Sequence, residues 1–366
     1  MDITPETTAS RLRETAASDI VSVEAFTALT EAIFISAGLT PDNARIAADA
    51  AVFPQLTGSE SHGVVTMPLY LTGLVEGTIR TDPEFATEQK RPGAAVIDAD
   101  AGLGLIAGYK AMSLACDLAA ETGVGAVAVR RSSHFGAAGY YSHLAACSGM
   151  IGLAMSNSSP AIAPTGGVDA LLGTNPIGAG VPLPGKPPMV LDMATATVAR
   201  SRIRQSLAAG EPAIPEGWAI DRSGEPTTDA AEAIEGSVLP IGGPKGYGLA
   251  LLVELLCSGL SDAEPGFSIT YENVVSRPSG ISHFFLAIDP AAFCGAEAFA
   301  ARADHISDVI ETSRPRPGGS APRLPGARGL HMAETVRKSG IAMHPNLRAA
   351  LLKSAEILAR IPTLAG

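Results

Sequence analysis

The sequence predicts a mixed α/β protein in which strands and helices do not alternate in regular βαβ units. Before residue 92, apolar residues recur at helical spacing. After it, short apolar runs bounded by Gly, Pro or Asp indicate strands, and only some of these runs are separated by helical stretches. This irregular order disfavours a simple doubly wound parallel sheet.

Composition narrows the class of protein. The 366 residues are 46% hydrophobic and 17% charged, which excludes a disordered acidic chain and allows a large core. The net charge is −11 and the chain has no basic run, so we expect no nucleic-acid partner.

Cysteine usage and hydropathy predict a soluble cytoplasmic protein. The four cysteines (Cys116, Cys147, Cys257 and Cys294) lie far apart without a C-x-x-C pair, so we expect reduced thiols and neither a disulfide nor a metal site. The N-terminal segment lacks the apolar stretch of a signal peptide. The longest apolar run, residues 249–256, is interrupted by Glu254 and is too short to span a membrane.

The first part of the chain is predicted to be helical. Phe26, Leu29, Ile33 and Ala37 predict a first ordered helix over residues 23–37, ended by Gly38. Thr40 is a suitable N-cap for a second helix that continues to about residue 52. A third helix is expected over residues 66–76.

The later part of the chain is predicted to contain most of the strands. The expected strands cover residues 94–98, 125–129, 151–156, 189–192 and 281–288. Helices are expected over residues 106–121, 247–260 and 345–360. The Pro- and Gly-rich segments 208–235 and 314–329 are predicted to be a surface excursion and a long extended loop.

A glycine-rich turn, Gly102 to Gly108, resembles a dinucleotide-binding fingerprint. Its third glycine comes one position too late, and no tight turn follows the preceding strand. Close packing at the start of a helix explains these glycines equally well, and we prefer that interpretation.

Several polar clusters are candidates for chemistry, and each has a simpler structural explanation. Ser61-His62 could transfer a proton, although a lone histidine is more often structural. The segment 131–136, which contains His134, follows a predicted strand, where α/β proteins commonly bind ligands, but it could also be a polar turn. The turns at Asn157, Thr174 and Asp192 use ordinary turn residues, and their spacing does not say whether they converge.

Lys245, between glycines at a predicted helix start, could contact a phosphate, although the Walker pattern is absent. The chain contains no apparent Ser/His/Asp order, carboxylate pair or metal-ligand cluster. From the residues alone, the best interpretation is an enzyme that binds an anionic cofactor.

Seven segments, in order, resemble one family along nearly the whole chain. These are Ser61-His62-Gly63-Val64, Ser133-His134-Phe135-Gly136, Gly173-Thr174-Asn175-Pro176, Leu191-Asp192-Met193-Ala194, Gly243-Pro244-Lys245-Gly246-Tyr247-Gly248, the segment 283–290 (HFFLAIDP), and Arg323-Leu324-Pro325-Gly326. Each is weak alone, and together they resemble the non-Rossmann malate/L-lactate dehydrogenase family. That family also includes ureidoglycolate and sulfolactate dehydrogenases, 2,3-diketogulonate reductase and Δ1-piperideine-2-carboxylate reductase.

The resemblance implies a fold of α+β character. A large, mostly antiparallel sheet, residues 76–329, would bind NAD or NADP. A helical domain would be formed by both chain ends, residues 1–75 and 330–366. The resemblance also implies a homodimer.

Site residues follow from the same resemblance. His62 would be the catalytic acid/base, oriented by Ser61, with His134 as the alternative acid/base. Thr66, Thr174, Arg200 and Arg202 would lie near the substrate. The cofactor would contact His134, Phe135, Gly136, Ala137, Ala138, Asp192, Met193, Ala194, Lys245, Arg323, Leu324, Pro325, Gly326, Ala327, Arg328 and Gly329.

Two positions depart from the family pattern. Thr66 stands where an Arg usually grips the substrate carboxylate, and a single hydroxyl cannot replace that charged fork. Arg202 stands where cyclic-imine reductases have Asp and hydroxy-acid enzymes tend to have Lys. Arg202 therefore favours hydroxy-acid chemistry, whereas Thr66 disfavours simple malate or lactate.

The sequence thus predicts an NAD(P)-dependent oxidoreductase that interconverts a 2-hydroxy acid and its 2-oxo acid, with a small carboxylate as substrate. One alternative is an NADPH-dependent reductase of a cyclic imine carboxylate. Another, of a different class, is a non-catalytic family member that binds a ligand without turnover.

Overall fold

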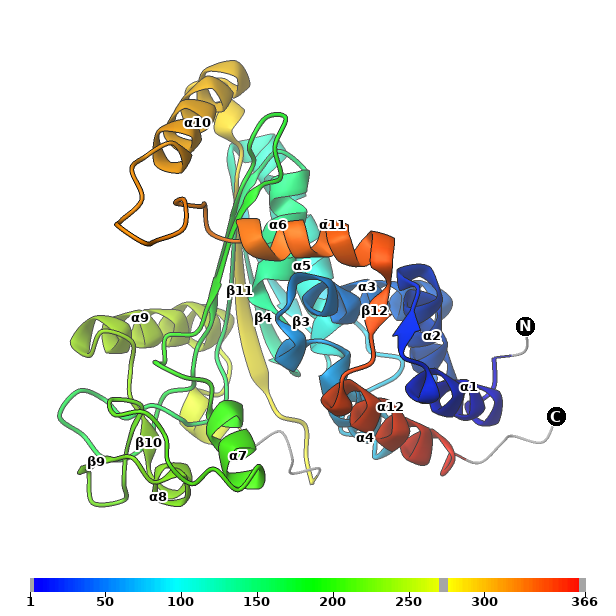
Figure 1. The fold of residues 1–366 in the computed structure, drawn as a ribbon. Helices are drawn as coiled ribbons and strands as arrows, with labels where there is room; N and C mark the ends of the chain where they lie inside the picture. The colour runs from blue at the N-terminus through cyan, green and yellow to red at the C-terminus, as the bar shows by residue number, and fades with distance from the viewer. Residues whose placement is uncertain (1–2, 270–275, 362–366) are drawn as a thin grey trace.

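A seven-stranded sheet forms the centre of the protein in the computed structural model, which describes residues 3–269 and 276–361 (Figure 1). Its strand order is β2-β3-β4-β11-β5-β6-β7, and each neighbouring pair is antiparallel except β3 with β4. The bounds are β2 (Ala86–Arg91), β3 (Ala94–Asp98), β4 (Val124–Ser132), β5 (Ile151–Ser156), β6 (Ile177–Val181), β7 (Met189–Met193) and β11 (Ile281–Ile288). The predicted mixed fold with a mostly antiparallel sheet is confirmed.

Helices cover both faces of this sheet. On β11, Phe285 packs into the main core, beside α5 (Gly104–Thr122) and α6 (Ala138–Cys147). The adjacent Phe284 faces the other way, toward Val253 and Cys257 of α9 (Pro244–Glu254) and the π-helical turn Leu255–Gly259. Because successive side chains of a strand point to opposite faces, a strand covered on both faces is apolar along most of its length, as β11 is.

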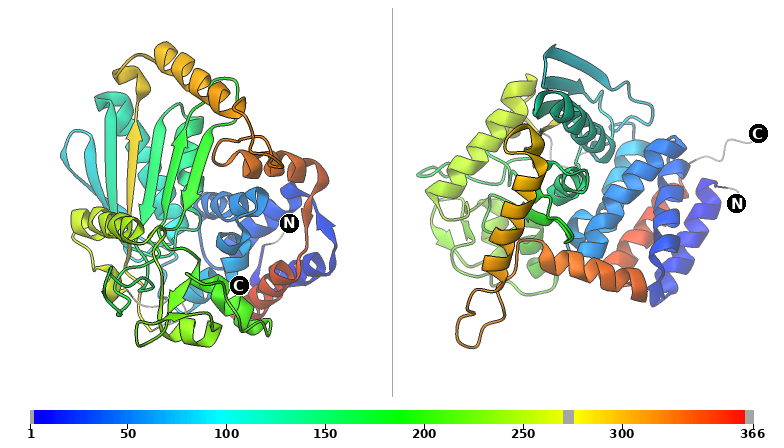
Figure 2. Two further views of the ribbon diagram at one scale, coloured as in Figure 1. Left: turned by 60° about the vertical axis from the view of Figure 1, so that its left-hand side comes forward. Right: turned by 90° about the horizontal axis from the view of Figure 1, so that it is seen from above.

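A group of helices from both chain ends packs beside the sheet. It contains α1 (Pro5–Ala17), α2 (Val23–Ser36), α3 (Pro41–Thr57), α4 (Met67–Val75), α11 (Ala327–Ser339) and α12 (Pro345–Leu358). Helix α1 lies against α12, and α11 lies against α3. Two short strands, β1 (Ile20–Val21) and β12 (Ile341–Ala342), also pair across this group (Figure 2). The domain boundaries themselves remain a prediction.

A smaller lobe lies at the lower left of Figure 1. It consists of β8 (Ala219–Ile220), β9 (Pro226–Thr227), β10 (Ser237–Val238), α7 (Arg200–Ala208) and α8 (Ala230–Glu235). Its own core includes Ile203, Ile214 and Ala219. The prediction that 208–235 is a surface excursion was therefore wrong, because apolar residues such as Ile214 and Ala219, scattered among Pro and Gly without periodicity, are buried here.

Other elements also differ from the expectations. The predicted first helix is preceded by α1, whose Thr4 and Thr7 form a capping box. The helix expected to end near residue 52 continues to Thr57. Helix α10 (Ala296–Glu311) was missed, and α11 begins at Ala327, inside the predicted loop 314–329. Among the described residues, no helix is long and apolar enough to cross a membrane.

Candidate active site

A cavity of about 540 Å³ lies where the helical group, the sheet and the small lobe meet. One wall comes from the single-turn 3-10 helices Glu60–His62 and Val64–Thr66 with the start of α4. The floor comes from the loop after β4 and the polar ends of β5 and β11, and the far wall is α7. The predicted site residues on its lining are Ser61, His62, Thr66, His134, Phe135, Gly136, Thr174 and Arg200.

His62 lies on a single-turn helix between α3 and α4. Ser61 Oγ and His62 Nδ1 are 3.0 Å apart, which is a hydrogen bond that orients the ring. A Cβ at Gly63 would lie only 3.0 Å from the Ala51 carbonyl oxygen, so glycine lets this turn approach α3 closely. The predicted pairing of Ser61 with His62 is present in the geometry.

His134 lies across from His62, with ring centroids 6.0 Å apart. The Gly136 N–H donates to His134 Nδ1 at 3.3 Å, and the Tyr70 hydroxyl lies 2.8 Å from the same nitrogen. Because a backbone N–H can only donate, Nδ1 is the acceptor and the proton of the neutral ring is on Nε2. Neutral His134 can therefore offer an N–H donor from Nε2.

The glycine-rich turn 102–108 starts helix α5 and is filled by the chain itself. The Gly104 N–H donates to Ser133 Oγ at 2.9 Å. A Cβ at Gly104 would lie 2.1 Å from the Ser133 carbonyl oxygen, and one at Gly108 would lie 2.6 Å from the Tyr141 ring. This packing agrees with the preferred interpretation of the turn as a helix start.

His283 supports the floor of the cavity from beneath. It is fully buried on β11, with Nδ1 2.9 Å from Ser156 Oγ and Nε2 2.9 Å from Ser132 Oγ. Its ring stacks on Phe135 at 4.6 Å. Burial lowers the pKa of His283 to about 3, so the ring is neutral at physiological pH.

Glu254 joins the loops that form the polar end of the cavity. This buried carboxylate accepts hydrogen bonds from the Asn157 and Asn175 amides at 3.1 and 3.3 Å. It also accepts from Ser258 Oγ and from the Gly266 N–H. The turns at Asn157 and Thr174 do converge on one site, which their spacing could not establish.

The arginines of α7 have different roles. The Arg200 guanidinium donates to the carbonyl oxygens of Pro160, at 3.2 Å, and of Ile234. Arg202 is not among the lining residues, and its guanidinium lies 5.4 Å from the Trp218 ring centroid. Arg204, one turn after Arg200, also lines the cavity, and no pattern in the sequence indicated this role.

Two of the segments predicted to contact the cofactor, residues 134–138 and 192–194, lie near the N-terminus of α6 and at the end of β7. The Gly139 N–H donates to the Asp192 carboxylate, so β7 is linked to the first turn of α6. The Asp192 side chain is exposed on one side, and protein atoms surround the rest of its carboxylate. The resulting loss of solvation raises the pKa of this carboxyl to about 6. Ala137 and Ala138 are buried at the same junction, while Met193 and Ala194 continue from Asp192.

The loop 323–329 lies against the edge of the sheet. The Val190 N–H of β7 donates to the Pro325 carbonyl at 3.1 Å, and Gly326 adopts a φ of +80° beside Val190. Lys245 is in the first turn of α9 and is exposed. The turn before it is joined to the end of β7 by a hydrogen bond from the Ile241 N–H to the Thr195 carbonyl. The contacts of these residues with a cofactor stay predictions.

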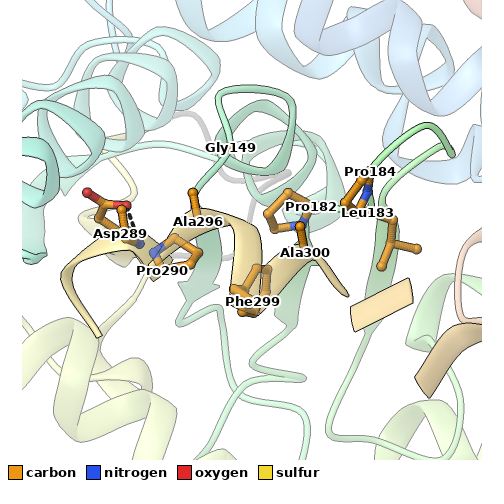
Figure 3. A pocket seen from close by; sticks show the side chains of 10 residues that line it. Gly149, Pro182, Leu183, Pro184, Asp289, Pro290, Ala296, Phe299 and Ala300 are labelled. Carbon is orange, nitrogen blue, oxygen red and sulfur yellow. Dashed lines mark hydrogen bonds between the residues drawn. The ribbon is translucent and has the colours of Figure 1, made fainter. Parts of the chain in front are cut away.

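A second, smaller crevice of about 210 Å³ lies at the opposite end of β11, beneath α10 (Figure 3). Pro182, Pro290 and Phe299 give it an apolar lining. Its acidic residue, Asp289, accepts a hydrogen bond from the Ala291 N–H. We assign this crevice to the packing of α10 on the sheet.

Comparison with known proteins identifies the family. The family model described as malate/L-lactate dehydrogenase matches residues 21–352. L-sulfolactate dehydrogenase of Methanocaldococcus jannaschii is 44% identical over 77% of this chain and 81% of its own. Malate dehydrogenase of Pyrococcus abyssi is 41% identical over 84% of this chain and 86% of its own.

Solved structures agree with this assignment. The M. jannaschii sulfolactate dehydrogenase structure superposes with a TM-score of 0.85, at 39% identity, over 93% of this chain and 97% of its own. The Δ1-piperideine-2-carboxylate reductase of Pseudomonas syringae gives a TM-score of 0.82 at 29% identity, over 93% and 100%. The names of two further relatives state the cofactor that each uses. One is an NADP(+) sulfolactate dehydrogenase of Chromohalobacter salexigens, and the other is an NAD(+) ureidoglycolate dehydrogenase of Escherichia coli.

These matches confirm the resemblance, the class of reaction and the nicotinamide cofactor expected from the sequence. The chain belongs to the malate/L-lactate dehydrogenase family, and the curated relatives named above are dehydrogenases of 2-hydroxy acids, with NAD or NADP as cofactor.

Proposed function

We propose that this chain interconverts a 2-hydroxy acid and its 2-oxo acid, with His62 as the acid/base. One observation carries the proposal: His62, held by Ser61, faces His134 across a cavity whose described lining contains arginines but no carboxylate. Such a cavity suits a small anionic substrate. It also places an imidazole, which can donate or accept a proton, beside that substrate.

In the reducing direction, His62 gives a proton to the oxygen on C2 of the oxo acid, and in the oxidising direction it takes that proton back. Ser61 keeps the imidazole oriented throughout. His134 donates a hydrogen bond from Nε2 to the bound reactants, since its Nδ1 is held by Tyr70 and Gly136. A bound nicotinamide supplies or accepts the hydride at C2.

The residues present fit a nicotinamide dinucleotide. Ser158, Ser159 and Thr174, whose side chains carry hydroxyl groups, are among the residues that line the cavity. The loop 134–138 leads from it to the first turn of α6, where helix N–H groups favour an anion. We propose that loop 134–138, residues 192–194, Lys245 and loop 323–329 hold the cofactor. A complex whose phosphates rest on the turn 102–108 would contradict this assignment.

Reduction of a cyclic imine carboxylate is the second candidate, and the structural similarity to the P. syringae reductase favours it. The discriminating assay offers 2-oxo acids and cyclic imines to the enzyme with NADH and with NADPH, and follows the absorbance of the reduced nicotinamide. We expect turnover of an oxo acid. Turnover of the imines alone would favour the second candidate, and binding of ligands without any turnover would indicate a non-catalytic member.

We also propose a homodimer that involves α9. Leu252 and Leu255 are 49% and 58% exposed, and Leu249, Leu251 and Leu260 are exposed beside them. Apolar surface of this kind commonly marks an interface. Sedimentation of the wild type and of Leu255→Glu tests this: we expect a dimer that the substitution weakens. A monomeric wild type would refute it.

A cytoplasmic location is proposed from the cysteines, because Cys116, Cys147, Cys257 and Cys294 are all free thiols. We further propose that residues 1–75 and 330–366 form one domain and 76–329 the other. The packing of α1 on α12 and of α11 on α3 supports this division. Limited proteolysis tests it, with first cleavage expected near the proposed boundaries.

A further inference from the structure

Among the described residues that line the cavity, those on the His62 wall include no arginine or lysine. Thr66 lies on this wall, and its hydroxyl donates to the Gly63 carbonyl at 2.7 Å. The donor capacity of Thr66 is therefore used within its own turn. An anionic substrate must find its cation on another wall.

Helix α7, on the far wall, carries the cations of the lining. Arg200 and Arg204 are four residues apart, so they lie on the same face of the helix. Arg200 is engaged by the carbonyl oxygens of Pro160 and Ile234, which fix its guanidinium in place. Arg204 is exposed, and within the described part of the chain no hydrogen bond or ion pair engages its guanidinium.

We propose that Arg204 binds the anionic group of the substrate. The proposal rests on the proposed function and adds its anion-binding residue. A guanidinium offers the two parallel N–H donors that match a carboxylate or sulfonate. Ser201, on the same helix, adds a hydroxyl to this wall.

Electrostatics favour this assignment. The chain has a net charge of −11, yet the described lining of the cavity holds two arginines and no carboxylate. A positive cavity in an acidic protein attracts anions selectively. Arg204 and His62 lie on opposite walls, so the preferred substrate is a 2-oxo acid long enough to reach both, with a carboxylate or sulfonate at its far end.

The test compares Arg204→Met with Arg204→Lys, and Arg222→Met is the matched control. Arg222 belongs to the same lobe but pairs with Glu235 on the surface. We expect Arg204→Met to raise the KM for the oxo acid roughly 10- to 100-fold, the contribution of hydrogen bonds to a charged group, with the KM for the cofactor unchanged. Arg204→Lys should recover part of the loss, and Arg222→Met should match the wild type. Calorimetric titration with oxalate, an unreactive dianion, should show the same order of affinity.

A double variant separates this role from loss of folding. Thr66→Arg in the Arg204→Met background restores a cation on the His62 wall and should recover affinity for short oxo acids. Three results would overturn the assignment: unchanged oxo-acid KM in Arg204→Met, a rise in cofactor KM instead, or the loss appearing in Arg202→Met rather than in Arg204→Met. Failure of the proposed function looks different, since the wild type itself would then turn over no oxo acid.

Discussion

Replacing His283 should make the protein less sensitive to acid. Its pKa falls from the ordinary 6.5 to about 3 because the ring is fully buried between Ser132 and Ser156. Between these two pH values the unfolded chain binds a proton that the folded protein does not. The folded state is therefore destabilised as the pH falls through 6.5, and stability continues to decline toward pH 3.

The magnitude follows from the size of the shift. Each pH unit below 6.5 removes about 1.4 kcal/mol from the free energy of unfolding, and the full window corresponds to about 5 kcal/mol. At about pH 5 the loss is therefore about 2 kcal/mol relative to neutral pH. This is a sizeable fraction of the roughly 5–15 kcal/mol that stabilises a folded protein.

His283→Gln removes the titrating group and keeps an amide that can bond to one of the two serines. The assay is urea unfolding of wild type and variant at about pH 7 and about pH 5. The variant should be less stable at neutral pH, but it should lose about 2 kcal/mol less than the wild type on acidification. His305→Gln, on exposed α10, controls for loss of one histidine. Equal losses in wild type and His283→Gln would refute the reasoning.

Three further predictions concern the site directly. His62→Ala should lower turnover roughly 100-fold or more with little change in cofactor binding, whereas His134→Ala should mainly weaken cofactor binding; the reverse pattern in kinetics and cofactor titration would exchange the two roles. Thr66→Arg alone should raise kcat/KM for pyruvate and oxaloacetate about tenfold, or ~1.4 kcal/mol, and an unchanged strong preference for oxaloacetate would show that Thr66 does not face the substrate. Glu254→Gln should raise the oxo-acid KM and reduce stability by about 1.5–3 kcal/mol in urea unfolding, because an NH₂ group would face hydrogen-bond donors; wild-type values for both would exclude Glu254 as the support of these loops.

The sequence predicts those strands whose ends carry Gly, Pro or Asp and whose interiors are apolar. Strands β3, β5 and β11 match the predicted ranges residue for residue. In contrast, β6 was missed because Ile177–Val181 contains two glycines, which are typical of turns. These glycines are required by packing: a Cβ at Gly180 would lie 2.0 Å from the Ser142 carbonyl oxygen of α6.

Apart from what the family resemblance implied, contacts within the site are predictable only between residues that are close in sequence. Ser61 and His62 are adjacent, so their pairing could be expected. Tyr70 reaches His134 across 64 residues, and His283 reaches Ser132 across 151. The first contact depends on how α4 packs against the loop after β4, and the second depends on the register between β11 and β4. No local sequence pattern encodes either one. Glu254 illustrates the same limit, since in the sequence it only interrupts an apolar run.

The role of Arg204 depends on a helix that the sequence did not predict. Residues 200–208 are mostly polar, so hydrophobic periodicity gives little signal there, although the buried Ile203 anchors α7 in the lobe. Once α7 is in place, Arg204 lies one turn beyond Arg200 and faces the same cavity. His62 is held by the helical group and Arg204 by the lobe, each with its own core. A substrate that contacts both His62 and Arg204 is therefore positioned by two parts of the protein with separate cores. The distance between these two side chains selects the length of the substrate.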